Sequence, residues 1–110
     1  MHIFVTGAAG LIGRAVVQEL ISHGHSVSGL VRSDSSADTI SKVGATPVRG
    51  TLEDLEVIRD AANNSDGAIH TAYSDDFSKH AEANEMDRAA IEAMAEGLEG
   101  TGKPLVITSV

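Results

Sequence analysis

Cysteine is absent from this 110-residue sequence. Without thiols, the chain has no disulfide framework, no thiolate zinc site and no cysteine nucleophile. Aromatic residues make up only 3% of the chain, so the core has to be built from valine, isoleucine, leucine and alanine. That composition suits helices packed on a parallel sheet, because the buried strands of such sheets are rich in aliphatic side chains.

Positive charge is also scarce. Lysine and arginine number 8 against 16 aspartates and glutamates, which gives a formal net charge of −8. Nucleic-acid binding requires a basic surface, so we expect no nucleic-acid partner, and the acidity is expected to serve solubility. No apolar stretch approaches the roughly 20 residues needed to span a bilayer, and the run from Ile3 to Val5 is too short for a signal peptide. We therefore expect a cytoplasmic protein without a membrane partner.

Short apolar runs alternate with longer amphipathic segments along the chain. The runs predict strands over residues 2–5, 26–31, 46–49, 67–72 and 105–108. The amphipathic segments predict helices over residues 11–23, 37–43, 52–63 and 76–98, with a polar loop over 33–36. Strands that alternate with helices imply parallel βαβ units with right-handed crossovers. We predict one α/β domain over residues 1–110, a three-layer, Rossmann-like, doubly wound parallel sheet in the order 3-2-1-4-5.

Glycines follow the first predicted strand at a spacing that suits a bound pyrophosphate. Gly7 can supply the tight turn, Gly10 lets the backbone approach the phosphates, and Gly13 lets the helix pack closely on the strand. The anion would meet the free N–H groups and the positive end of that helix. The residues predicted to contact a dinucleotide here are Gly7, Ala9, Gly10, Leu11, Ile12 and Gly13.

Two alternatives exist for this turn. One is a glycine-rich turn with no ligand. This interpretation is the weaker one, because the glycines have the spacing of the motif and lie between a predicted strand and a predicted helix. The other is a mononucleotide P-loop, which fits poorly because that motif enters its helix with Gly-Lys-Ser/Thr. This chain has Ile12-Gly13-Arg14 at the corresponding place.

The residue that follows the second strand of a dinucleotide fold reads the adenosine ribose. An acidic side chain there accepts a hydrogen bond from the ribose 2′-hydroxyl of NAD, and a nearby arginine accommodates the 2′-phosphate of NADP. Arg32 and Ser33 occupy that place, so we predict NADP(H) as the cofactor, with NAD as the alternative. Arg32 could instead be a solvated surface residue, and Asp34 could take a ribose hydroxyl, which would favour NAD.

The run from Val5 to Gly13 resembles the Thr-Gly-x-x-Gly-x-x-Gly signature of the extended and atypical short-chain dehydrogenases/reductases. This superfamily contains NAD(P)-dependent epimerases, dehydratases and reductases. The resemblance implies further cofactor contacts from Thr51 and Leu52 after the third strand, and from Ala72 and Tyr73 after the fourth. The family usually has an aspartate where this chain has Thr51, and a helix-capping role for Thr51 is equally compatible with the sequence.

The resemblance also implies a catalytic Tyr-x-x-x-Lys pair, which this chain lacks. Its single tyrosine is Tyr73, and position 77 is Phe77. Ser109 lies where the family's substrate-orienting Ser or Thr begins, so no catalytic set is complete. We interpret His70, on a predicted buried strand, as a core residue.

We predict an oxidoreductase represented by the N-terminal, cofactor-binding part of a longer enzyme, truncated after the fifth strand. This interpretation is favoured because the chain ends on an apolar strand, whereas domain ends are usually polar. The alternatives are a catalytically inactive module that binds or senses NADP(H), and a folded remnant without a ligand. The resemblance further implies a homodimer through the 76–98 helix, although ordinary core packing also explains the apolar side chains of that helix.

Overall fold

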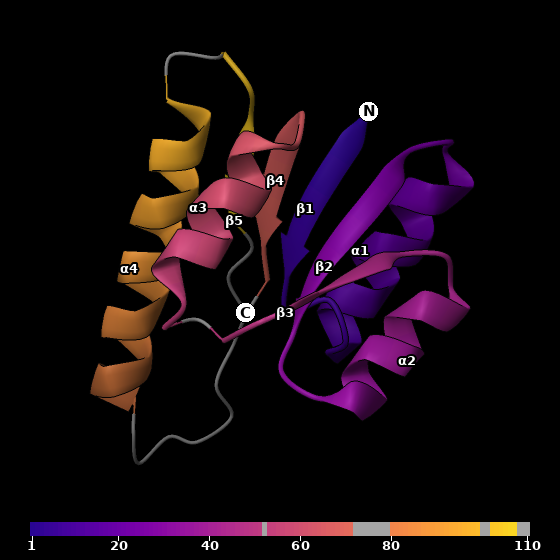
Figure 1. Cartoon of the computed structure of the whole chain (residues 1–110), viewed down its shortest axis with the longest axis horizontal. Helices are drawn as coiled ribbons and strands as arrows, with labels where there is room; N and C mark the ends of the chain where they lie inside the picture. The colour runs from indigo at the N-terminus through magenta and orange to yellow at the C-terminus, as the bar shows by residue number, and fades with distance from the viewer. Residues whose placement is uncertain (52, 72–79, 100–101, 108–110) are drawn as a thin grey trace.

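The computed structural model describes residues 1–51, 53–71, 80–99 and 102–107, with backbone alone for residues 11, 80–87 and 107. Strands and helices alternate strictly along the described chain (Figure 1). In order they are β1 His2–Thr6, α1 Leu11–Ser22, β2 Ser26–Val31, α2 Asp34–Lys42, β3 Thr46–Arg49, α3 Leu55–Asn63, β4 Gly67–His70, α4 His80–Leu98 and β5 Leu105–Ile107.

The strands of the described part form one five-stranded sheet in the order β3-β2-β1-β4-β5. Every neighbouring pair is parallel. At the centre of the sheet, Val5 of β1 lies beside Gly29 on one side and Ile69 on the other. The predicted fold class and strand order are therefore confirmed.

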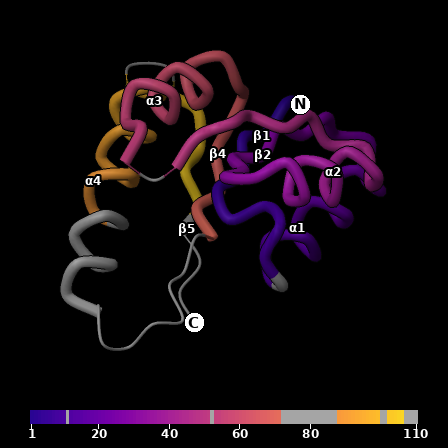
Figure 2. Tube along the Cα trace, turned by 60° about the horizontal axis from the view of Figure 1, so that its bottom comes forward, coloured from indigo at the N-terminus to yellow at the C-terminus, as the bar shows by residue number. Residues whose placement is uncertain are grey.

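Helices cover both faces of the sheet. Figure 1 shows α1 and α2 on one side and α3 and α4 on the other, and the turned view in Figure 2 shows the same separation. Successive side chains of β1 point to opposite faces of the sheet. Ile3 and Val5 pack on the face covered by α1 and α2, and Phe4 packs on the face covered by α3 and α4. Phe4 and Val5 are each completely buried, so β1 is the central support of both halves of the core.

The start of α2 differs from the sequence prediction. Residues 33–36 were expected to form a polar loop, but α2 begins at Asp34 with Ser33 as its N-cap. The Ser33 Oγ accepts a hydrogen bond from the Ser36 N–H at 3.1 Å. A serine that satisfies a free N–H of the first turn favours helix over loop, and the sequence interpretation overlooked this capping signal.

The predicted start of α3 was also wrong, by three residues. The expected helix begins at residue 52, whereas α3 begins at Leu55 with Asp54 at the N-cap. The Asp54 carboxylate accepts the Thr51 N–H at 2.8 Å, and the Asp54 N–H donates to the Thr51 carbonyl at 3.0 Å. These two bonds close a separate turn before the helix. Thr51 and Asp54, three residues apart, also resemble the capping box of a helix start, and the predicted helix therefore included this turn.

Asp66 joins the beginning of β4 to the beginning of β1. Its carboxylate accepts the His2 N–H at 2.8 Å, and this bond is the main reason that the pKa of Asp66 lies below its ordinary value of 3.8.

The lowered pKa of Asp66 makes the stability of the fold depend on pH. The ionised carboxylate stabilises the folded chain above the ordinary pKa, and this contribution is lost as the pH falls through the lowered pKa of the folded state. We expect Asp66→Asn to flatten the fall in stability below about pH 4, measured by urea unfolding. Parallel pH profiles for both proteins would contradict this role.

Candidate functional site

The carboxyl ends of the strands share one edge of the sheet, because all the strand pairs are parallel. Chain order reverses beside β1, which pairs with β2 on one side and β4 on the other. In open α/β sheets, ligands bind outside the carboxyl ends of the strands at such a switch point. The loops that leave β1, β2, β3 and β4 at this edge are therefore the candidate site.

The turn after β1 presents bare backbone at the start of α1. Gly7 has a φ of +65°, and its carbonyl accepts the Gly10 N–H at 3.0 Å. Gly10 is the N-cap of α1 and supplies no side-chain hydrogen bond to the helix. The first N–H groups of a helix have no intrahelical partner, and the first turn of α1 contains no acidic residue. This arrangement favours an anion at the end of the helix.

Gly13 is the position of closest approach in this turn. A Cβ at Gly13 would lie 1.8 Å from the Gly7 carbonyl oxygen and 3.0 Å from the Ala8 Cα. The close packing is therefore between α1 and the backbone of the turn, whereas the sequence predicted packing between the helix and the strand. The consequence is the same requirement for glycine, because any side chain would displace the turn from the helix.

Gly29 of β2 also supports the turn, although the sequence analysis did not single it out. A Cβ at Gly29 would lie 2.5 Å from the Ala8 Cβ and 2.9 Å from the Ile40 Cδ1. Ala8 is completely buried against this strand, so a second glycine outside the motif allows the turn to sit on the sheet. The available signal was an isolated glycine within a strand, which indicates a close approach.

Beneath the switch point, hydrogen bonds join the carboxyl ends of β1 and β4. The buried Thr6 hydroxyl lies 2.7 Å from His70 Nδ1 and accepts the Thr71 N–H at 3.2 Å. The Thr71 hydroxyl donates to the Thr6 carbonyl at 2.5 Å. His70 is only 2% exposed, so its interpretation as a core residue is confirmed, and these bonds join the ends of β1 and β4 below the candidate site.

Charged side chains gather at the carboxyl ends of β2 and β3. Arg32, directly after β2, is exposed, and Ser33 caps α2. Arg49, the last residue of β3, forms an ion pair with Asp34, and its Nη2 donates to the Arg32 carbonyl at 3.3 Å. The sequence analysis placed Arg32, Ser33 and Asp34 at this edge but missed Arg49, because a β3 residue joins them only through the strand order.

Thr51 is partly occupied by local hydrogen bonds. Its hydroxyl accepts the Glu53 N–H at 3.2 Å within the turn that precedes α3. The helix-capping interpretation of Thr51 is therefore wrong, because Asp54 is the N-cap of α3. The predicted positions Leu52, Ala72, Tyr73 and Ser109 lie outside the described residues, as does the beginning of the 76–98 helix.

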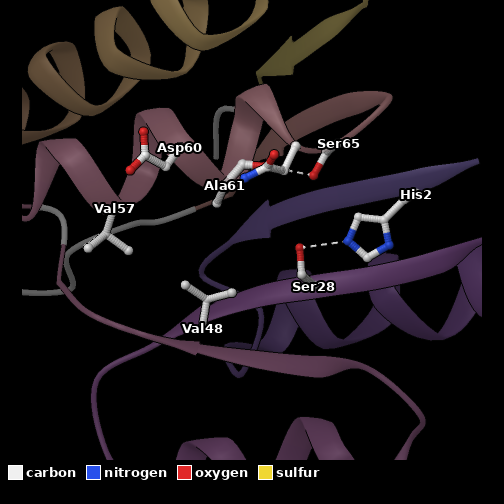
Figure 3. A pocket seen from close by; sticks show the side chains of 8 residues that line it. His2, Ser28, Val48, Val57, Asp60, Ala61 and Ser65 are labelled. Atoms are coloured by element: carbon white, nitrogen blue, oxygen red, sulfur yellow. Dashed lines mark hydrogen bonds between the residues drawn. The ribbon is translucent and has the colours of Figure 1, made fainter.

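A separate hollow of about 390 Å³ lies between the sheet and α3 (Figure 3). It is lined by His2, Ser28, Val48, Val57, Asp60, Ala61, Asn64 and Ser65. His2 begins β1, whereas the glycine turn follows the end of β1, and α1 lies on the opposite face of the sheet. The hollow is therefore distinct from the candidate site.

In the part of the chain that the structure describes, no group of three or more histidine, aspartate or glutamate side chains is placed to hold a metal ion. None of the helices there combines the length and the apolar character needed to cross a membrane.

A doubly wound parallel sheet, with a glycine-lined helix start that has no side-chain cap at its switch point, defines a dinucleotide-binding domain of the Rossmann class. Comparison with known families agrees, because residues 7–109 match the NAD(P)H-binding family model. The chain belongs to that family, within the short-chain dehydrogenase/reductase superfamily.

The chain is similar to a limited part of several longer curated proteins, and each match covers only a fraction of the relative's length. An uncharacterised protein of Schizosaccharomyces pombe is 50% identical over 110 residues, which cover 100% of this chain and 37% of the relative. A decarboxylating sterol-4-alpha-carboxylate 3-dehydrogenase of Dictyostelium discoideum is 39% identical over 71 residues, covering 64% of this chain and 22% of that enzyme. The chain thus spans well under half the length of these relatives.

Solved structures show the same fold. The UDP-glucose 4-epimerase of Thermotoga maritima superposes with a TM-score of 0.81 at 23% identity, covering 100% of this chain and 38% of the epimerase. A short-chain dehydrogenase/reductase superfamily protein of Agrobacterium tumefaciens, solved with bound NAD, gives a TM-score of 0.75 at 26% identity. That match covers 99% of this chain and 32% of the other.

Proposed function

We propose that this chain is the cofactor-binding part of a short-chain dehydrogenase/reductase-like oxidoreductase that prefers NADP(H) to NAD(H). The observation that carries the preference is the position of Arg32, exposed directly after β2. A dinucleotide fold that selects NAD has an acid there for the ribose 2′-hydroxyl. Asp34, two residues further along the chain, is paired with Arg49, and Arg32 offers a planar set of donors that suits a phosphate.

The same edge of the sheet supports the placement of the rest of the cofactor. The pyrophosphate would lie at the start of α1, against the backbone of Gly7, Gly10 and Gly13 and the neighbouring Ala9, Leu11 and Ile12. The adenosine would extend toward the ends of β2 and β3, where Arg32, Ser33, Thr51 and Leu52 are predicted contacts. The nicotinamide would extend past β4 toward Ala72 and Tyr73, as the family resemblance implies.

Oxidoreductase activity is proposed for the whole protein from its relatives. The Dictyostelium relative is a dehydrogenase, and the structurally similar Agrobacterium protein was solved with NAD. A catalytically inactive NADP(H)-binding or sensing module is the second candidate, because no lysine lies four residues after Tyr73. A cytoplasmic location and a homodimer through the 76–98 helix stay predictions.

Replacing the exposed Arg32 tests the cofactor preference. We expect Arg32→Met to weaken NADPH binding by about tenfold to a hundredfold, because a charge-assisted hydrogen bond contributes about 1.5–3 kcal/mol. NADH binding should change by less than about twofold, since NADH has no 2′-phosphate for Arg32 to contact. Calorimetric titration of both nucleotides at one salt concentration measures the two effects.

Lys42→Met provides the matched control, because Lys42 is an exposed cation in the last turn of α2. It removes one positive charge from the end of α2 that is distant from the site, whereas Arg32 precedes the start of that helix, so neither nucleotide should bind differently. Equal affinity of the unmodified chain for NADH and NADPH would refute the preference. An equal loss for both nucleotides in Arg32→Met would refute the role of Arg32.

A further inference from the structure

We infer that Arg49 is a second specificity-determining residue, which exchanges the Asp34 carboxylate for the 2′-phosphate of NADP(H). This inference rests on the proposed function, because it needs NADP(H) in the candidate site. The family resemblance pointed only to the segments after β2 and β3, whereas Arg49 is the last residue within β3. Its assignment comes from its contacts with the loop between β2 and α2.

The strand register places Arg49 beside Arg32 and Ser33, the residues between β2 and α2 that are proposed to contact the adenosine ribose. Val31, the last residue of β2, pairs with Arg49 in the parallel ladder between β2 and β3. Arg32 follows Val31 directly, and its carbonyl accepts the Arg49 Nη2 at 3.3 Å. The Arg49 guanidinium therefore lies beside the backbone of the residue that is proposed to read the 2′ position.

The ion pair with Asp34 is exposed, so it can be exchanged. The Arg49 side chain is 52% exposed and that of Asp34 is 97% exposed. Exposed ion pairs contribute little to stability, because water screens the charges and ordering the side chains costs entropy. A phosphate that carries more charge than a carboxylate, and accepts a bidentate pair of hydrogen bonds from a guanidinium, competes well for the same donors.

The two members of the pair have opposite effects on a 2′-phosphate. Asp34 lies in the first turn of α2, two residues after Arg32, and its negative charge repels a phosphate at that end of the helix. Arg49 neutralises this charge in the unliganded chain and already lies near the position that the phosphate would take. The pair thus keeps the Arg49 cation in place for NADP(H) while Asp34 balances its charge.

A double-mutant cycle distinguishes direct contact from simple neutralisation. We expect Arg49→Met to weaken NADPH binding by about tenfold, with NADH binding unchanged within about twofold. Asp34→Asn alone should tighten NADPH binding by a few-fold. The tenfold effect of Arg49→Met should persist in the Asp34→Asn background, because the phosphate contact does not depend on the carboxylate. Calorimetry gives the affinities, and thermal unfolding confirms that each variant is folded.

Arg59→Met is the matched control. Arg59 is also a partly exposed arginine, paired with Glu96 at 3.2 Å, but it joins α3 to α4 on the other side of the sheet. Its replacement removes one positive charge and one surface ion pair, yet it should leave both affinities unchanged. This control separates a local role of Arg49 from the change in net charge.

The outcomes separate the inference from the proposed function. If Arg49→Met has no effect in the Asp34→Asn background, Arg49 only neutralises Asp34 and the inference is wrong. An equal loss of NADH and NADPH binding would show a structural role and would also overturn it. If the unmodified chain prefers NADPH and loses that preference in Arg32→Met but not in Arg49→Met, the inference alone fails. If the unmodified chain shows no preference for NADPH, the proposed function fails and the inference with it.

Discussion

Gly10→Asp is expected to weaken binding of both NADPH and NADH by at least about a hundredfold, without destabilising the fold. A carboxylate at Gly10 would lie beside the pyrophosphate at the start of α1. Two like charges about 4 Å apart near a protein surface repel by about 4 kcal/mol, which exceeds the 2.8 kcal/mol of a hundredfold loss. Calorimetric titration of the variant with each nucleotide measures the loss.

The same substitution should leave stability unchanged or slightly improved. Gly10 has φ −75° and ψ 173°, which is extended backbone that any residue adopts. Aspartate is also a better N-cap than glycine, by a few tenths of a kcal/mol. Loss of binding together with an unchanged or higher unfolding temperature therefore identifies an effect on the ligand alone.

Gly10→Asn is the matched control for charge. Asparagine has the same size as aspartate and caps helices equally well, but it carries no negative charge. It should weaken nucleotide binding by much less than Gly10→Asp does. Equal losses in the two variants would show that bulk, and not repulsion, excludes the ligand. Retained binding in Gly10→Asp would place the pyrophosphate elsewhere.

Gly13→Ala is expected to lower the free energy of unfolding by about 3 kcal/mol, at the upper end of the usual cost of overpacking. The new Cβ would overlap the Gly7 carbonyl, 1.8 Å away. Both groups belong to the backbone, so no side-chain rotation relieves the overlap, and α1 has to move away from the turn. Urea unfolding at neutral pH measures the loss.

The sign of this effect is diagnostic. In an ordinary helix, replacing glycine with alanine stabilises by about 0.5–1 kcal/mol. Gly10→Ala serves as the matched substitution in the same turn, since its Cβ would lie 3.3 Å from the Gly7 oxygen and needs only a small adjustment. A stabilising Gly13→Ala, or equal losses at both positions, would contradict the packing of α1 on the turn.

The bounds of several strands and the glycine turn could be predicted because each depends on local patterns. The bounds of β2 and β3 are those that the apolar runs predicted, residues 26–31 and 46–49. The glycines at 7, 10 and 13 lie at the junction between β1 and α1, where the motif requires them. Right-handed crossovers then leave few arrangements for a chain that alternates strands and helices.

Features that depend on the assembled sheet could not be predicted in this way. Arg49 reaches Asp34 only because β3 pairs with β2. The two residues are 15 positions apart in the sequence, and nothing in the segment between them indicates the contact. Gly29 lies under Ala8 because β2 is adjacent to β1. The starts of α2 and α3 were misplaced because Ser33 and Thr51 can each close a turn or cap a helix, and packing decides between these roles.

The central claim is that the start of α1, which has no side-chain cap, receives the pyrophosphate of a nicotinamide dinucleotide. Its most direct test is a titration of the unmodified, ¹⁵N-labelled chain with NADP⁺, following the backbone amide signals by two-dimensional NMR. The largest shifts are expected at the amides of Gly10, Leu11 and Ile12, with further shifts at Arg32 and Ser33. Saturating NADP⁺ that leaves these amides unchanged, while shifting others such as those around the hollow beside α3, would contradict the claim.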